Sequence, residues 1–146
     1  MSGFLRGFGG RVERGRVLVA ALGAPGQEGE APDRPGAVPR HLRDAGFEVI
    51  VAGAVPSVLA VAAVARDEDV DAVVLAVGAG RHDAVGELMS ALRDEDLSVP
   101  VVVATTGDGA AAPSSITAEV AVLSPDAGPA EVVGALERAI SGAGDR

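Results

Sequence analysis

Short, unbroken apolar runs recur along this chain and alternate with longer segments whose apolar residues are spaced as on one face of a helix. A strand that is buried on both faces is apolar at every position, whereas a half-exposed strand alternates apolar and polar residues. The pattern therefore predicts consecutive βα units, which build a parallel sheet covered by helices on both sides. The predicted strands are residues 17–22, 47–52, 72–77, 99–104 and 120–123.

Residues that start and stop helices stand between these runs. Gly46 occupies the place of a left-handed residue that ends a helix, and the pairs Pro56-Ser57 and Gly128-Pro129 are typical of helix starts. A segment after Pro113 is short and rich in Ser and Thr, which are poor helix formers, so a single turn is the alternative there. The predicted helices are residues 37–45, 57–66, 83–94 and 130–141, with the weak one after Pro113.

The βα units predict a flavodoxin-like, doubly wound α/β domain of three layers. We expect a five-stranded parallel sheet in the order 2-1-3-4-5, with right-handed crossovers and all strand carboxyl ends at one edge. At 146 residues the chain is long enough for one domain with its own core and short for two. We divide it into an N-terminal arm (residues 1–14), the domain (residues 15–141) and a tail (residues 142–146).

The composition argues against several kinds of enzyme. The chain has no Cys, which removes thiolate metal sites and cysteine nucleophiles, and all 12 of its basic residues are Arg. A Schiff-base or P-loop lysine is therefore missing, as is the conserved lysine of a phosphorylation receiver. Neither a Ser, His and acid trio in a familiar order nor a dinucleotide-binding glycine pattern occurs. We expect no catalysis by this chain alone.

Charge and hydropathy restrict the partners. A net charge of -9 and the absence of Trp and Tyr argue against nucleic acid, which needs basic patches and aromatic stacking platforms. No apolar run is long enough to cross a bilayer, and the first ten residues lack a signal-peptide core, so we expect a cytoplasmic protein without a membrane partner. The acids Glu28, Glu30 and Asp33 stand among prolines without a calcium-loop pattern, so no metal site is predicted.

Several segments, taken in order, resemble the cobalamin-binding domain of methylmalonyl-CoA mutase and related acyl-CoA mutases. The most distinctive is the Gly-Phe-Glu-Val step of residues 46–49. The resemblance covers about residues 14 to 141 at the level of the scaffold, and it implies the same fold with a cofactor site at the carboxyl edge of the sheet. The segments that carry it are residues 16–20, 44–49, 71–74, 79–82, 101–103 and 128–131.

The first ligand motif of that family is altered here. The resemblance implies a DxHxxG loop after the first strand, in which a histidine ligates cobalt and is oriented by the aspartate. The matching loop, residues 29–36, contains no histidine. The ligand position falls on Ala31, or on Asp33 if Gly36 is matched to the motif glycine. Neither residue can replace imidazole as the usual lower ligand.

Two further elements of the family's site are altered as well. The Ser-x-Leu after the third strand, whose hydroxyl contacts the cofactor's tail base, falls on residues 76–78 and begins with Ala76. The glycine pair after the fourth strand falls near Ala104 and Thr105. His82 does match the family, but a helix-start residue without function is the alternative for it. The positions of this degenerate site are Ala31, Asp33, Gly36, Ala76, Gly78, His82, Ala104 and Thr105.

A retained scaffold with lost ligand motifs predicts a protein that binds no cofactor and is a non-catalytic accessory or interaction module. Its partner would be an acyl-CoA mutase or a related protein, and a homo-oligomer stays open. The alternative is a cobalamin carrier or mutase subunit that holds the cofactor with its own base on cobalt. A deep slot beside Ala76 and Ala104 would favour that alternative, whereas a lost site predicts a shallow or filled cleft.

The N-terminal arm carries the largest apolar side chains outside the predicted domain. Phe4, Leu5 and Phe8 stand there together with Arg6 and Arg11. Aromatic residues and arginines are the preferred anchors of interfaces. This pattern predicts docking of the arm on its own domain or on another protein, and a disordered leader is the alternative.

Overall fold

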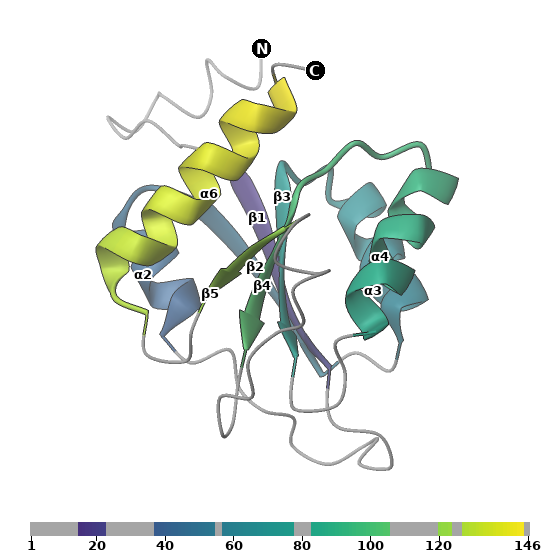
Figure 1. Ribbon diagram of the computed structural model, residues 1–146, viewed down its shortest axis with the longest axis horizontal. Coiled ribbons are helices and arrows are strands. Elements are labelled where there is room, and N and C mark those ends of the chain that lie inside the picture. The colour runs from purple at the N-terminus through teal and green to yellow at the C-terminus, as the bar shows by residue number, and fades with distance from the viewer. Residues whose placement is uncertain are drawn as a thin grey trace.

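A computed structural model describes residues 15–22, 37–54, 57–77, 83–105, 120–123 and 127–144 of the chain. No helix within these ranges is long and apolar enough to span a membrane. The elements, labelled as in Figure 1, are β1 (Arg16–Leu22), α2 (Val38–Asp44), β2 (Glu48–Ala54), α3 (Val58–Asp67), β3 (Ala72–Val77), α4 (Asp83–Asp94), β4 (Val101–Thr105), β5 (Ala121–Leu123) and α6 (Pro129–Gly144).

The strands form one five-stranded sheet in the order β2-β1-β3-β4-β5, and every neighbouring pair is parallel. Helices α2 and α6 cover one face, and α3 and α4 cover the other (Figure 1). The predicted flavodoxin-like α/β fold and its strand order are therefore confirmed. All strand carboxyl ends lie at one edge, called here the carboxyl edge, and all strand starts lie at the opposite amino edge.

Several predicted boundaries differ from the structure for local reasons. Phe47 precedes β2, because it belongs to the turn that ends α2, where its N–H donates to the Leu42 carbonyl at 3.0 Å. Residues 99 and 100 precede β4, since Pro100 has no N–H to donate to the ladder. Helix α6 continues to Gly144, so residues 142–144 of the predicted tail are helical. The weak helix predicted after Pro113 lies outside the described residues.

The core consists of two layers of small aliphatic side chains, one on each face of the sheet. Alternate residues of β1 point to opposite faces, so Leu18 packs towards α3 and α4, while Val19 packs towards α2 and α6. All six residues of the central strand β3 are buried. Because each fully buried Val or Leu contributes about 1.5–3 kcal/mol, β3 is the stability centre of the domain.

Three helices end at the amino edge with the same hydrogen-bonded turn, in which one residue adopts a left-handed conformation. That residue is Gly46 after α2 (φ 101°), Asp69 after α3 (φ 52°) and Asp96 after α4 (φ 60°). After α4, the N–H of Asp96 donates to the Arg93 carbonyl at 3.0 Å, and the N–H of Leu97 donates to the Leu92 carbonyl at 2.9 Å. These two bonds define the Schellman motif, and their equivalents follow α2 and α3.

Polar contacts fix the start of β1 at the amino edge. Asp71 Oδ2 accepts a hydrogen bond from the Arg16 N–H at 2.8 Å, and Arg16 Nη1 donates to the Glu68 carbonyl at 2.5 Å. Arg16 Nε lies 3.2 Å from Glu48 Oε1, with the geometry of an ion pair and not of a hydrogen bond. Gly15, with φ 139°, sits directly beside the Asp71 carboxylate. This cluster holds β1 in register between β2 and β3.

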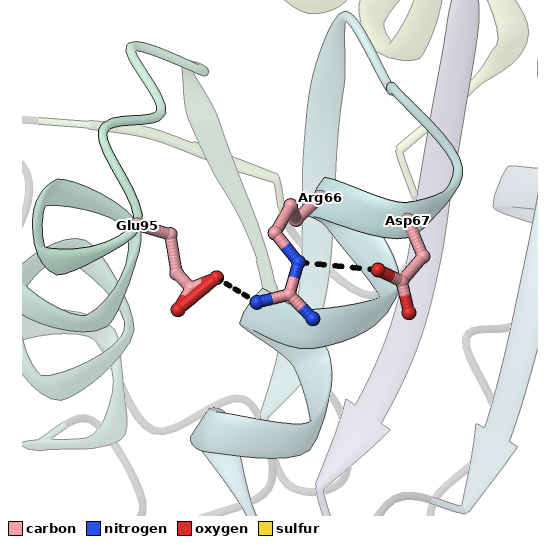
Figure 2. A network of polar contacts seen from close by, with 3 residues as sticks. All are labelled: Arg66, Asp67 and Glu95. Atoms are coloured by element: carbon pink, nitrogen blue, oxygen red, sulfur yellow. Dashed lines mark hydrogen bonds and ion pairs between the residues drawn. The ribbon is translucent and has the colours of Figure 1, made fainter.

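Helices α3 and α4 are joined at the same edge by Arg66 (Figure 2). Its guanidinium donates to Asp67 Oδ1 at 3.1 Å and also to the Glu95 carboxylate, just beyond the end of α4. The hydrogen bond to Asp67, followed by the bond to Glu95, raises the pKa of Arg66. Because Arg66 is exposed to solvent, the network orients the two helices but adds little to stability.

Candidate functional site

Doubly wound folds bind their ligands outside the carboxyl ends of the strands, so the carboxyl edge is the first place to search for a site. Strands β1, β3 and β4 end there, and helices α3, α4 and α6 begin there (Figure 1). The helix starts match the sequence pattern. Ser57 caps α3, because its Oγ accepts a hydrogen bond from the Ala60 N–H at 3.3 Å, and Pro129 is the first residue of α6.

The structure brings two of the predicted site positions together. Ala76 on β3 and Ala104 on β4 are direct neighbours in the parallel ladder. Thr105 follows Ala104 as the last residue of β4, opposite Val77. The other predicted positions lie outside the described residues; they are Ala31, Asp33, Gly36, Gly78 and His82.

Alanines occupy one row across the sheet at this edge. Ala21 of β1 pairs with Ala54 of β2 and with Ala76 of β3, and Ala76 pairs in turn with Ala104 of β4. Ala76 is 1% exposed and Ala104 is 4% exposed. Both belong to the core layer under α2 and α6, together with Val132. Ala76 and Ala104 therefore pack into the core beneath α2 and α6.

The described part of the carboxyl edge carries little reactive chemistry. The Ser57 hydroxyl is used as a helix cap, and Asp83 stands exposed in the first turn of α4. Within the described ranges, no three His, Cys, Asp or Glu side chains are grouped closely enough to hold a metal ion.

A groove of about 690 Å³ lies at the other edge of the sheet, where sequence reasoning did not place a site. It is formed by residues 97–100 ahead of β4 and Val101 at its start, by Val120 and Ala121 at the start of β5, and by side chains of α4 and α6. One sequence signal does mark it. Ala135, Ala139 and Gly142 recur at intervals of four and three residues, so one stripe of α6 carries only small side chains towards the groove.

Comparison with solved structures identifies relatives of the fold. The chain superposes on the methanol:cobalamin methyltransferase complex MtaBC from Methanosarcina barkeri with a TM-score of 0.66 and 17% identity, covering 88% of this chain and 47% of that one. A novel cobalamin-binding protein from Desulfitobacterium hafniense DCB-2 gives a TM-score of 0.59 and 18% identity, covering 86% of this chain and 58% of that one. The chain thus spans about half the length of these two structures.

The same fold also serves proteins of another kind. A CheY-like protein, TadZ from Pseudomonas aeruginosa PAO1, gives a TM-score of 0.55 and 21% identity, covering 90% of this chain and 94% of that one. No model of a known protein family matches the chain, and no curated protein sequence matches it. At these identities the comparisons establish the fold alone: a flavodoxin-like domain of the kind found in cobalamin-binding proteins.

Proposed function

We propose that this protein is a cobalamin-domain-like interaction module that has lost its cofactor site and carries out no catalysis. The observation that carries the proposal is the burial of Ala76 and Ala104 at the carboxyl edge. In the mutase family that the sequence resembles, these positions border the cofactor tail. Here the core layer that contains them is closed by α2 and α6.

Opening a slot for a cofactor tail would require α6 to move away from the sheet. A slot beside Ala76 and Ala104 would uncover neighbours in the same core layer, among them Val132 and Leu136, both 0% exposed. Exposing two such side chains costs about 3–6 kcal/mol at about 1.5–3 kcal/mol each. That is a large share of the 5–15 kcal/mol by which a domain is stable. Without a histidine in residues 29–36, cobalt ligation by the protein would not repay that loss.

The interaction part of the proposal rests on what remains after the site is lost. The domain keeps its sheet and its helices, and its described residues offer no catalytic group pair. A cytoplasmic partner that itself handles cobalamin or acyl-CoA chemistry, such as an acyl-CoA mutase, fits a scaffold of this ancestry. The neighbour MtaBC is named as a complex, which supports the general idea that such domains work beside a second protein.

The second candidate is a carrier that binds cobalamin with the cofactor's own base on cobalt. It is favoured by the likeness in fold to two cobalamin-binding structures. It requires a slot that α2 and α6 fill in this conformation, so it predicts a measurable change in structure when the cofactor is added.

One experiment separates the two candidates. The purified protein is mixed with hydroxocobalamin or adenosylcobalamin and desalted, and the absorbance of the protein fraction is recorded. We expect a colourless fraction from the native protein. The matched control is Ala76→Leu, which places a larger side chain where the tail would lie. A stoichiometric red complex that the native protein forms and Ala76→Leu does not would overturn the proposal, and its spectrum would give the ligation state.

A direct binding measurement tests the partner. Titration of this protein into a purified acyl-CoA mutase from the same source, followed by calorimetry, should give saturable binding. The absence of binding to mutases and to their maturation proteins would remove the accessory role, whatever the outcome with cobalamin.

A further inference from the structure

The walls of the groove at the amino edge, defined above, are mostly apolar. Its walls include Met89 from α4, Leu97 and Val99 from the segment ahead of β4, and Val120 ahead of β5. Helices α4 and α6, which contribute the two sides, cover opposite faces of the sheet (Figure 1). The groove therefore runs around the end of the sheet at β5, the strand at its margin.

The groove is open because the side chains that meet there are short or only partly buried. Val99 and Val120 pack against the core layer of α3 and α4 but stay partly exposed. On the other side, α6 presents Ala139 and Gly142, which leave space beside the sheet. A volume of about 690 Å³ is within the range of about 300–1,000 Å³ that encloses small ligands and anchoring side chains.

Charged groups stand around this apolar surface. Arg93 and Arg138 line it, and neither forms an ion pair with an acid among the residues that the structure describes. Asp94 and Asp96 are exposed just ahead of Leu97 in the chain. The groove thus offers cations beside its apolar walls, and exposed carboxylates precede the Leu97 segment in the chain, which suits an occupant that carries both aromatic rings and positive charges.

We propose that the N-terminal arm of the same chain, residues 1–14, folds back over the amino edge and inserts Phe4 and Phe8 into this groove. The inference goes beyond the proposed function, because it concerns a surface away from the cofactor edge. The rings would lie against the apolar walls and beside the guanidinium groups of Arg93 and Arg138, in cation–π contact. Arg6, between the two rings in sequence, would face the acids at the end of α4.

The N-terminal arm joins the domain close enough to the groove to reach it. Gly15 lies at the amino edge, where its carbonyl accepts the Glu48 N–H at 2.8 Å, and it leads directly into β1. From β1 to β5 the sheet crosses three strand spacings, about 14 Å at about 4.8 Å each. Phe8 stands seven residues before Gly15, and seven extended residues span up to about 23 Å. Both phenylalanines can therefore arrive at the groove without displacing β1.

The composition makes a clean test available, because the chain contains no Trp and no Tyr. A single Trp placed in the arm, as Phe8→Trp or Phe4→Trp, is the only strong fluorophore of the full-length protein. The matched control is Leu59→Trp on α3, at a position that is 70% exposed. We expect Phe8→Trp to emit at shorter wavelength than Leu59→Trp and to be quenched several-fold less by iodide.

Filling the groove should release the arm. In Phe8→Trp combined with Ala139→Arg, the new side chain occupies the α6 side of the groove, and the emission should move to that of Leu59→Trp. Met89→Arg fills the groove from the α4 side instead. It replaces Ala139→Arg in the experiment if circular dichroism shows that Ala139→Arg does not fold. Neither residue belongs to the carboxyl edge, so the cobalamin experiment is independent of this one.

Three outcomes would overturn the proposal. Emission of both arm variants at the solvent-exposed wavelength means that the arm is not docked. A short-wavelength emission that neither groove substitution changes places the arm elsewhere. A short-wavelength emission that depends on protein concentration and accompanies a doubled mass in solution places the arm in the groove of a second copy.

Discussion

Replacing Asp96 by Gly should stabilise the protein, although it removes a side chain. Asp96 has φ 60° in the turn that ends α4. The two hydrogen bonds of that turn are both made by backbone groups. The side chain contributes no contact to this turn that Gly would lose. The conformation itself is one that Gly adopts freely and other residues adopt at a cost.

Three effects set the size of the change. Removing the Cβ from a left-handed residue gains about 1 kcal/mol, at the low end of the usual range because Asp tolerates this conformation. Removing a negative charge from a helix C-terminus gains about 0.3 kcal/mol more at an exposed position. The greater freedom of Gly in the unfolded chain takes back about 0.5–1 kcal/mol. A net gain of about 0.5 kcal/mol, or a rise of about 1–2 °C in Tm, is expected.

Urea unfolding followed by far-ultraviolet circular dichroism is the suitable assay, since the chain has no Trp or Tyr for fluorescence. The series Asp96→Gly, Asp96→Asn and Asp96→Ala separates the effects. Asn removes only the charge, whereas Ala removes both the charge and the polar group and keeps the Cβ. We expect stability to fall in the order Gly, Asn, native, Ala.

Two matched substitutions control for position. Asp94→Gly changes the last residue of α4, which is helical, and should destabilise by about 0.5–1 kcal/mol. Gly46→Ala puts a Cβ into the equivalent turn after α2, at φ 101°, and should cost about 1–2 kcal/mol. If Asp96→Ala proves as stable as Asp96→Gly, the left-handed conformation is not what limits this turn and the reasoning is wrong.

Further predictions concern the core and the amino edge. Leu75→Ala, at a position that is 0% exposed in β3, should cost about 2–5 kcal/mol and lower the urea midpoint without changing the m value. Gly15→Ala should cost about 1–3 kcal/mol, since its φ is 139° and a Cβ would lie 3.1 Å from Asp71 Oδ2. Asp71→Ala alone should also destabilise, because Asp71 accepts the Arg16 N–H, but the added cost of Gly15→Ala should be smaller in that background. Arg66→Gln should barely shift Tm, and the remaining difference should vanish in 1 M salt, because this ion pair is solvent-exposed.

The fold could be predicted because each strand has a recognisable local sequence pattern. Continuous apolar runs such as residues 72–77 are required by burial on both faces, and β3 is buried at every position. The order of the strands followed from the handedness of βα crossovers and from the resemblance to a family, neither of which needs atomic detail. Strand ends were less accurate, because Phe47 and Val99 are apolar since they pack against the core layers without pairing in the sheet.

A repeated motif at the helix ends escaped the sequence analysis. Residues 42–47, 65–70 and 92–97 all read apolar, Arg, Asp, any residue, Gly or Asp, apolar. Only the first contains glycine, so only that one was recognised as a left-handed stop. The two Asp versions form the same turns, since their backbone hydrogen bonds outweigh the strain of the conformation.

The candidate site could be predicted only in part. The sequence placed Ala76 and Ala104 at the end of neighbouring strands, and the ladder brings them side by side. Their burial depends on how α2 and α6 pack, which no local pattern encodes. The groove was beyond sequence reasoning for the same reason, because its walls join Met89 and Ala139, fifty residues apart.

The repeated turns at the amino edge give the domain two ends of different character. At the amino edge, α2, α3 and α4 each lead to the next strand within a few residues, and backbone groups within each turn form hydrogen bonds with one another. The two longest stretches between described elements, residues 23–36 and 106–119, each follow the carboxyl end of a strand, β1 and β4. Insertions and substitutions can accumulate in those stretches while the hydrogen-bonded turns at the amino edge preserve the register of the sheet. A domain built this way can change its carboxyl-edge surface without having to evolve a new fold.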